Sequence, residues 1–285
     1  MTNINNPSDH AANDNIPMLH LKEGCCIELL KALPDCSVDL ILADLPYNIT
    51  PLAIDKKIDL AAVWRQFRRV LTPTGTIVCF AVQPFTTDLI NEGRDWFKYS
   101  RIWEKNKATG FANAKNSPMR IHEDLLVFSP GTAIQASRSA RRMTYNPQGV
   151  VSCGMKVMRP RRSIRYLGKV LGSVKARTYE AFTNYPTSIM RYAKDRQRSR
   201  FHHPFAKPVA LLEELILTYS NVGDVVLDPT MGSGSTGVAA INTKREFVGM
   251  EQDRAFYELA SERLFEAVTA KCAVNDNHRS EHEAA

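Results

Sequence analysis

The chain has 285 residues, of which 44% are apolar and 24% charged, and 37 Lys and Arg against 30 Asp and Glu give a formal net charge of +7. This composition excludes a wholly disordered or collagen-like chain, and since no apolar stretch reaches about 18 residues, no membrane span is expected. Residues 1–17 lack the features of a secretory signal, so we expect a disordered N-terminal arm on a cytoplasmic protein. The six cysteines show no metal-ligand spacing, so no metal site is expected.

The N-terminal half alternates short apolar runs with segments of helical spacing. The runs predict strands, because four to eight consecutive apolar residues are typical of a strand buried on both faces. The predicted strands are residues 37–44 (SVDLILAD), 75–82, 99–103 and 125–129, and the predicted helices are residues 60–71 and 84–93.

The C-terminal half has the same alternation. Pro208 is expected to open a helix, and Asp253 to cap the last helix. Between them, strands are predicted at 224–228 and 246–250, a helix at 235–242, and after them a flexible tail at 271–285. Strands that alternate with helices predict an α/β fold with a doubly wound, mostly parallel sheet.

Positive charge is concentrated between residues 131 and 208, which hold 17 Lys and Arg but only two acids, Glu180 and Asp195. The rest of the chain has 20 bases and 28 acids. Aromatic residues are interleaved with these arginines, a combination that suits phosphate pairing and base stacking. A solvated basic face or a disordered arm is the alternative. The candidate nucleic-acid contacts are Arg138, Arg141, Arg142, Arg159, Arg161, Arg162, Arg165, Lys169, Lys175 and Arg177.

A glycine-rich motif, residues 232–237 (GSGSTG), matches G-x-G-x-x-G between a predicted strand and a predicted helix. Glu251 follows at the end of the next strand, where an acid can accept hydrogen bonds from ribose hydroxyls. A dinucleotide, S-adenosylmethionine or a merely structural turn would each explain the motif. Only 48 residues follow Gly237, so the remaining strands must come from the N-terminal half, which predicts a circularly permuted sheet.

A second motif, Asp44-Leu45-Pro46-Tyr47, lies at the carboxyl end of the first predicted strand, where ligand chemistry occurs in open α/β sheets. Taken alone, such an Asp is as well explained by a helix or turn cap.

Together these motifs resemble the amino-methylating DNA methyltransferases, and more closely the β-ordered group, in which the catalytic motif precedes the cofactor motif. DLPY stands for D-P-P-Y, residues 228–237 (DPTMGSGSTG) for the glycine motif, and residues 203–208 (HPFAKP) for H-P-x-x-K-P. Residues 103–128 also look like this group, and the resemblance covers roughly residues 19–270 apart from the basic segment. It implies a catalytic half at 18–130, a target-recognition segment at 131–202 and a cofactor half at 203–270.

The resemblance also implies roles for residues. The Asp44 carboxylate and the Leu45 carbonyl would hold the amine of a flipped-out base in double-stranded DNA, and Tyr47 would stack on that base. Lys207 would meet the carboxylate of S-adenosylmethionine or else pair with a nearby acid, and Asp44 at the first motif position favours adenine N6. The cofactor-binding set would be Phe205, Lys207, Asp228, Pro229, Gly232, Ser233, Gly234 and Glu251.

Three positions depart from the family pattern: Leu45 replaces Pro, Thr230 replaces the usual Phe, and Cys25 stands where the family often has an acid. A cytosine-N4 enzyme, a DNA-binding protein on a decayed scaffold and an NAD-dependent oxidoreductase therefore remain alternatives. Family membership also suggests a homodimer, whereas a restriction endonuclease partner and the recognition sequence are not readable from one chain.

Overall fold

A computed structural model describes residues 17–47, 58–133, 140–166, 169–194 and 206–283. Its main unit comprises residues up to Tyr145 and from Ile189 onward, and a second compact unit spans Asn146–Ser188. The second unit is shorter than the expected recognition segment at 131–202. Residues on either side of it join the main unit; Met143, for example, is buried in the main core.

The main unit is built on one eight-stranded sheet in the order β1-β12-β11-β2-β3-β5-β4-β10. Every neighbouring pair is parallel except those of β5, which runs antiparallel to β3 and β4. The strands are β1 (Leu19–Glu23), β2 (Val38–Ala43), β3 (Leu71–Ala81), β4 (Phe97–Thr109), β5 (Arg120–Phe128), β10 (Ile189–Arg191), β11 (Val225–Asp228) and β12 (Glu246–Glu251).

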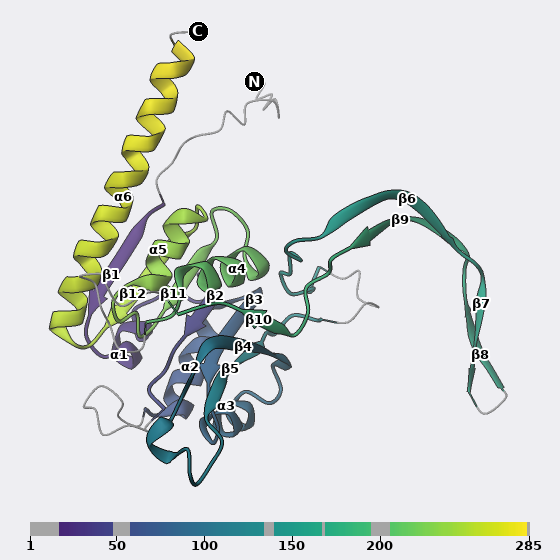
Figure 1. Cartoon of the computed structure of the whole chain (residues 1–285), viewed down its shortest axis with the longest axis horizontal. Coiled ribbons are helices and arrows are strands. Elements are labelled where there is room, and N and C mark those ends of the chain that lie inside the picture. Colours follow the sequence, from purple (N-terminus) through teal and green to yellow (C-terminus); the bar gives the residue numbers. More distant parts are fainter. Residues whose placement is uncertain (1–16, 48–57, 134–139, 167–168, 195–205, 284–285) are drawn as a thin grey trace, which may run out of the picture. The chain divides into compact units, whose positions relative to one another are not determined.

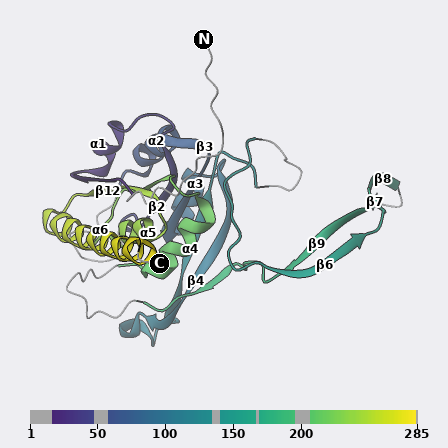
Figure 2. The ribbon, with the colours of Figure 1, turned by 90° about the horizontal axis from the view of Figure 1, so that it is seen from above.

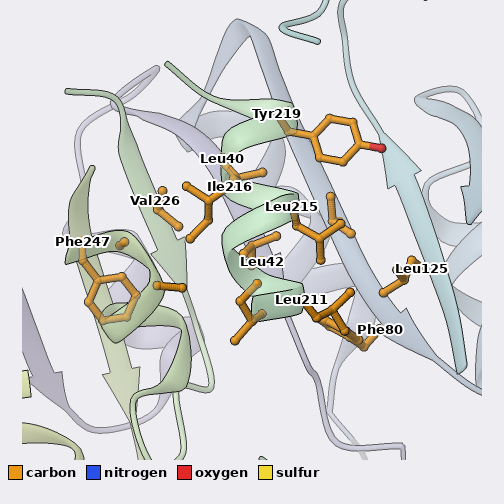
Figure 3. Packing of buried hydrophobic residues seen from close by; sticks show 14 of the residues in the cluster. Leu40, Leu42, Phe80, Leu125, Leu211, Leu215, Ile216, Tyr219, Val226 and Phe247 are labelled. Atoms are coloured by element: carbon orange, nitrogen blue, oxygen red, sulfur yellow. The ribbon is translucent and has the colours of Figure 1, made fainter. Parts of the chain in front are cut away.

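Strand alternation divides the core into two layers. On β2, Leu40 and Leu42 face one cluster and Ile41 and Ala43 face the other, because successive side chains of a strand point to opposite faces. The first cluster is closed by α4 (Val209–Tyr219), α5 (Ser235–Asn242) and α6 (Arg254–Glu283), as Figure 3 shows for α4. The second is closed by α1 (Cys26–Lys31), α2 (Leu60–Val70) and α3 (Phe85–Glu92). The expected doubly wound α/β fold is thus confirmed (Figure 1).

The strand order also confirms the permutation. β11 and β12, from the C-terminal part of the chain, lie in the sheet between β1 and β2 from the N-terminal part. The loop after β11 and the loop after β2 therefore leave neighbouring parallel strands at the same edge, although the motifs are far apart in sequence.

Two expectations about secondary structure are corrected. Residues 271–283 continue helix α6 and do not form an irregular tail, since the segment from Arg254 to Glu283 contains neither Gly nor Pro and is rich in good helix formers. None of the described helices is long and apolar enough to cross a membrane. In addition, β4 and β5 are longer than predicted, because their outer ends pair only with each other and lack apolar runs.

The second unit is a β-ribbon for which no strands were predicted (Figure 2). β6 (Val151–Arg159) pairs antiparallel with β9 (Arg177–Thr183), and β7 (Arg162–Tyr166) pairs with β8 (Lys169–Val174). All nine residues of β6 are exposed, so this strand has no apolar face covered by the rest of the chain. Apolar and basic residues are mixed along it, which hides the alternation that marks a half-buried strand.

Candidate functional site

The two sequence motifs meet at the carboxyl edge of the sheet. β2 and β11 pair in parallel through Leu40 with Val226 and Ile41 with Leu227, and both chains turn out of the sheet shortly afterwards. There the Thr230 hydroxyl donates a 3.1 Å hydrogen bond to the backbone carbonyl of Asp44. Thr230, a departure from the family pattern, thus joins the glycine-motif loop to the DLPY loop.

Both carboxylate oxygens of Asp44 accept hydrogen bonds. The Tyr47 hydroxyl donates to Oδ1 at 2.7 Å, and the Lys207 ammonium donates to Oδ2 at 2.5 Å. The Asp44 side chain keeps 23% of its exposure, so it is reachable from solvent at this edge. A carboxylate oxygen has more than one lone pair, so Asp44 can accept further hydrogen bonds without losing either contact.

Behind Asp44 lies a row of alternating charges. Lys207 Nζ is 3.5 Å from Glu123 Oε2, and Glu123 Oε1 is 2.5 Å from Lys105 Nζ. The side chains of Lys105, Glu123 and Lys207 are at most 10% exposed. Buried ions persist only when paired, so each member of the row depends on its neighbours to stay charged.

Burial and pairing compete in setting the pKa values of this row. Burial raises the pKa of Asp44, and Lys207 opposes this rise. Burial acts against ionisation of Glu123 as well, but Lys207 and Lys105 outweigh it and lower the pKa of that carboxyl. For Lys207, Asp44 and Glu123 outweigh burial and raise its pKa, so this ammonium stays charged.

The other DLPY side chains form the floor beside Asp44. Leu45 is 1% exposed and packs in the second core cluster, while Pro46 and Tyr47 are half-buried. The Tyr47 ring lies 5.2 Å from the ring of Phe85 at the start of α3. Burial and the nearby Asp44 raise the pKa of the Tyr47 phenol well above its usual value, so Tyr47 acts as a hydrogen-bond donor.

The glycine-motif loop runs between β11 and α5. Gly232 has φ +52° and Gly234 has φ +76°, left-handed conformations that favour glycine. Glu251, at the end of β12, holds this loop: its Oε2 accepts from the Gly232 backbone N–H at 2.9 Å, and its Oε1 accepts from the Asp253 N–H at 2.8 Å. The loop therefore presents backbone rather than side chains next to a carboxylate.

Asp228 lies buried beneath the same loop. Its carboxylate accepts from the Thr230 backbone N–H at 3.0 Å and from the Thr236 hydroxyl at 2.6 Å. Burial dominates over these hydrogen bonds and raises the pKa of Asp228 to about 7. Pro229 and Ser233 are also buried, and Arg263 of α6 donates to the Ser233 carbonyl and hydroxyl.

The structure brings most predicted site residues together, with one reassignment. Lys207 was expected at the cofactor or beside an acid, and its ammonium lies on Asp44 and Glu123. Phe205 lies outside the described residues. The sequence analysis did not assign Glu123, Lys105 and Arg263. A buried acid at 123 could have been suspected, because Glu123 alternates with Leu125 along the inward face of β5.

The predicted nucleic-acid contacts fall in both units. Arg141 and Arg142 are exposed in the main unit, and Arg159, Arg161, Lys169 and Lys175 are exposed in the second. Arg162, Arg165 and Arg177 belong to strands whose side chains at these positions are not described, and Arg138 lies outside the described residues.

Residues 38–262 match a family model described as DNA methylase, which covers N6 and N4 enzymes. DNA adenine methyltransferase YhdJ of Escherichia coli K12 is 30% identical over 260 residues, 85% of this chain and 81% of that protein. Type II methyltransferase M.HpaI of Haemophilus parainfluenzae is 28% identical over 255 residues, 84% of this chain and 71% of that protein.

Two solved structures share the fold. The M1.HpyAVI–SAM complex superposes with a TM-score of 0.59 at 22% identity, over 87% of this chain and 99% of that one. The cytosine-N4-specific PvuII DNA methyltransferase gives 0.60 at 13% identity, over 90% and 95% of the two chains.

Proposed function

Because the chain belongs to the DNA methylase family of N6 and N4 methyltransferases, we propose that it methylates the exocyclic N6 amine of adenine in double-stranded DNA. The observation that carries this proposal is the joining of the two motifs: Asp44 is bonded through its carbonyl to Thr230, next to the glycine-motif loop. A base amine held by Asp44 would therefore lie beside a cofactor held by that loop.

The glycine-motif loop fits S-adenosylmethionine as the cofactor. Gly232 and Gly234 place no side chain between the backbone and a ligand, and each Glu251 oxygen accepts one hydrogen bond among the described residues. Each oxygen keeps a lone pair for a ribose hydroxyl. We assign Asp228, Pro229 and Ser233 to the methionine end, with Phe205 nearby. When bound, this cofactor supplies an electrophilic methyl group.

The residues of the chain then have to orient a poor nucleophile. The lone pair of an adenine amine is delocalised into the ring, so the Asp44 carboxylate and the Leu45 carbonyl accept its two hydrogens and align it for transfer. Asp44 also receives the proton that the amine loses when its new N–C bond forms. Lys207 keeps the Asp44 carboxylate in place, and Tyr47 turns from Phe85 to stack on the flipped-out base.

Adenine is favoured over cytosine by two observations. The relative YhdJ, whose name specifies adenine, is 30% identical to this chain, and the first motif residue is Asp. The likeness to the cytosine-N4-specific PvuII enzyme extends to the fold alone, at 13% identity.

The basic residues of the second unit belong to this proposal as phosphate contacts. Arg159, Arg161 and Lys169 are exposed, and Glu180, paired with Ser152, is the one acid in that unit's sequence. Replacing any one of these cations by Ala should lower the salt dependence of DNA binding by about one counterion. A cytoplasmic homodimer stays a prediction.

Methyl transfer from labelled S-adenosylmethionine to unmethylated DNA, followed by nucleoside analysis, tests the proposal. The wild type and the control D88A, an exposed acid of α3, should form N6-methyladenine, and D44A should form none. N4-methylcytosine would refute adenine specificity alone. If the wild type transfers nothing and D44A binds DNA equally well, the chain is a DNA-binding protein on a decayed scaffold.

A further inference from the structure

The hairpin of β4 and β5 extends beyond the carboxyl edge of the sheet. Asp124 of β5 pairs with Ala81, the last residue of β3, and beyond this point residues 120–123 pair with β4 alone. At about 3.3 Å per residue, Arg120 stands roughly 13 Å past the end of β3. The hairpin tip, residues 110–119, continues from there, and Figure 1 shows it in teal below the β4 and β5 labels.

The tip is anchored in the candidate active site. Glu123, on the same strand β5, contacts Lys207, which in turn bonds Asp44. Both ends of the tip thus begin a few residues from the row of buried charges, and all of these residues belong to one compact unit. The tip lies on the side of the sheet from which a substrate reaches Asp44.

The tip is a built loop. A 3-10 turn at Phe111–Asn113 follows Gly110, whose φ is +93°. The Asn116 side-chain amide donates to the Asn113 side-chain oxygen at 2.8 Å, and the Asn113 amide donates to the Ser117 hydroxyl at 3.0 Å. These bonds hold the turn in shape with no help from a hydrophobic core.

At its apex this loop exposes an aromatic ring among cations. Phe111 is 82% exposed, the largest value among the exposed large apolar residues of the described chain. Lys107, Lys115 and Arg120 are exposed around it, no described carboxylate forms an ion pair with them, and no acid occurs between Lys105 and His122. An apolar side chain flanked by unpaired cations is the arrangement with which proteins wedge into DNA base steps.

We infer that the β4–β5 tip is a second DNA-contact surface, in which Phe111 inserts into the gap that the target base leaves in the duplex. This inference rests on the proposed function, since a base must leave the helix before Asp44 can hold its amine. Extrusion costs stacking energy, and an aromatic ring in the vacated place recovers part of it, while Lys107, Lys115 and Arg120 neutralise the adjacent phosphates. A second copy of this chain is the competing occupant of the tip.

Fluorescence of the F111W variant tests the insertion without requiring methyl transfer. Addition of unmethylated duplex DNA should quench the new indole, whereas the control F265W, at a 72% exposed position of α6, should show no DNA-dependent quenching. DNA binding is followed in parallel by anisotropy. Quenching by DNA supports the insertion even if the wild type transfers no methyl group, so a failure of the proposed function is distinguishable. Binding without quenching at position 111, or quenching that depends on protein concentration without DNA, overturns it.

The kinetic counterpart uses F111A with F265A as the matched control. Stacking contributes about 1–3 kcal/mol per base, so F111A should lower methyl transfer to a paired duplex by about tenfold or more. A mismatch opposite the target base makes extrusion cheap and should restore most of that loss. Equal rates for F111A and F265A on the paired duplex, or no recovery on the mismatched one, would contradict the role of Phe111.

Discussion

Asp228 stores a conflict between stability and cofactor binding, and D228N should expose it. The carboxyl is buried, and its pKa rises from 3.8 to about 7 because burial disfavours the ionised form. At 1.36 kcal/mol per pKa unit, this shift corresponds to about 4 kcal/mol against folding once the group is ionised. Asn has the same shape and carries no charge, so it removes this cost.

The direction with pH follows from proton linkage. Between pH 4 and 7 the folded state holds a proton on Asp228 that the unfolded chain has released, so the stability of the wild type falls as pH rises through this window. The D228N variant lacks this loss. Its free energy of unfolding should therefore gain about 3 kcal/mol relative to the wild type between pH 5 and pH 8.

Urea denaturation of both proteins at pH 5 and pH 8 measures this difference, with D88N as a control for the loss of one exposed negative charge. In D228N the Asn oxygen can still accept from the Thr230 N–H, and its amide can donate to Thr236, so the fold should be kept. Calorimetry should show at least tenfold weaker binding of S-adenosylmethionine to D228N. A stability difference that is the same at both pH values would refute the reasoning about burial.

Three further substitutions probe the site. K207M leaves the Asp44 carboxylate without its buried cation and should cost roughly 3–5 kcal/mol in urea denaturation; methyl transfer should fall while the Kd for S-adenosylmethionine stays within about threefold, and a selective rise of that Kd would instead support a cofactor contact. Y47F removes the 2.7 Å bond to Asp44 but keeps a ring for stacking, so kcat should drop about tenfold with DNA affinity unchanged by anisotropy. G234A forces a side chain to φ +76° with its Cβ about 3.2 Å from that of Ala260, and its Tm should fall by several degrees; an unchanged Tm would show that the loop relaxes freely.

The regular elements of the main unit could be read from the sequence because local pattern decides them. The run at 37–44 became β2, and the residues predicted for one side of the helix at 60–71 include Val63, Trp64 and Phe67, which are buried in α2. The sequence analysis missed β1 and α1. β1 is half-buried at the sheet edge, and α1 has six residues, too few to show a helical period.

The site required the fold. The two motifs were recognisable in sequence, but the bond from Thr230 to Asp44 spans 186 positions and exists because β11 lies beside β2. Lys207 reaches Asp44 across 163 positions, and its second partner Glu123 comes from β5. Such long-range pairings depend on strand order, which residue spacing does not encode.

Methylation-sensitive sequencing of DNA from cells that express the wild type or D44A tests the central claim most directly. The account predicts N6-methyladenine at one defined sequence motif in the wild-type sample and an unmodified motif in the D44A sample. Identical modification in the two samples, or unmodified DNA from cells with folded wild-type protein, would contradict it.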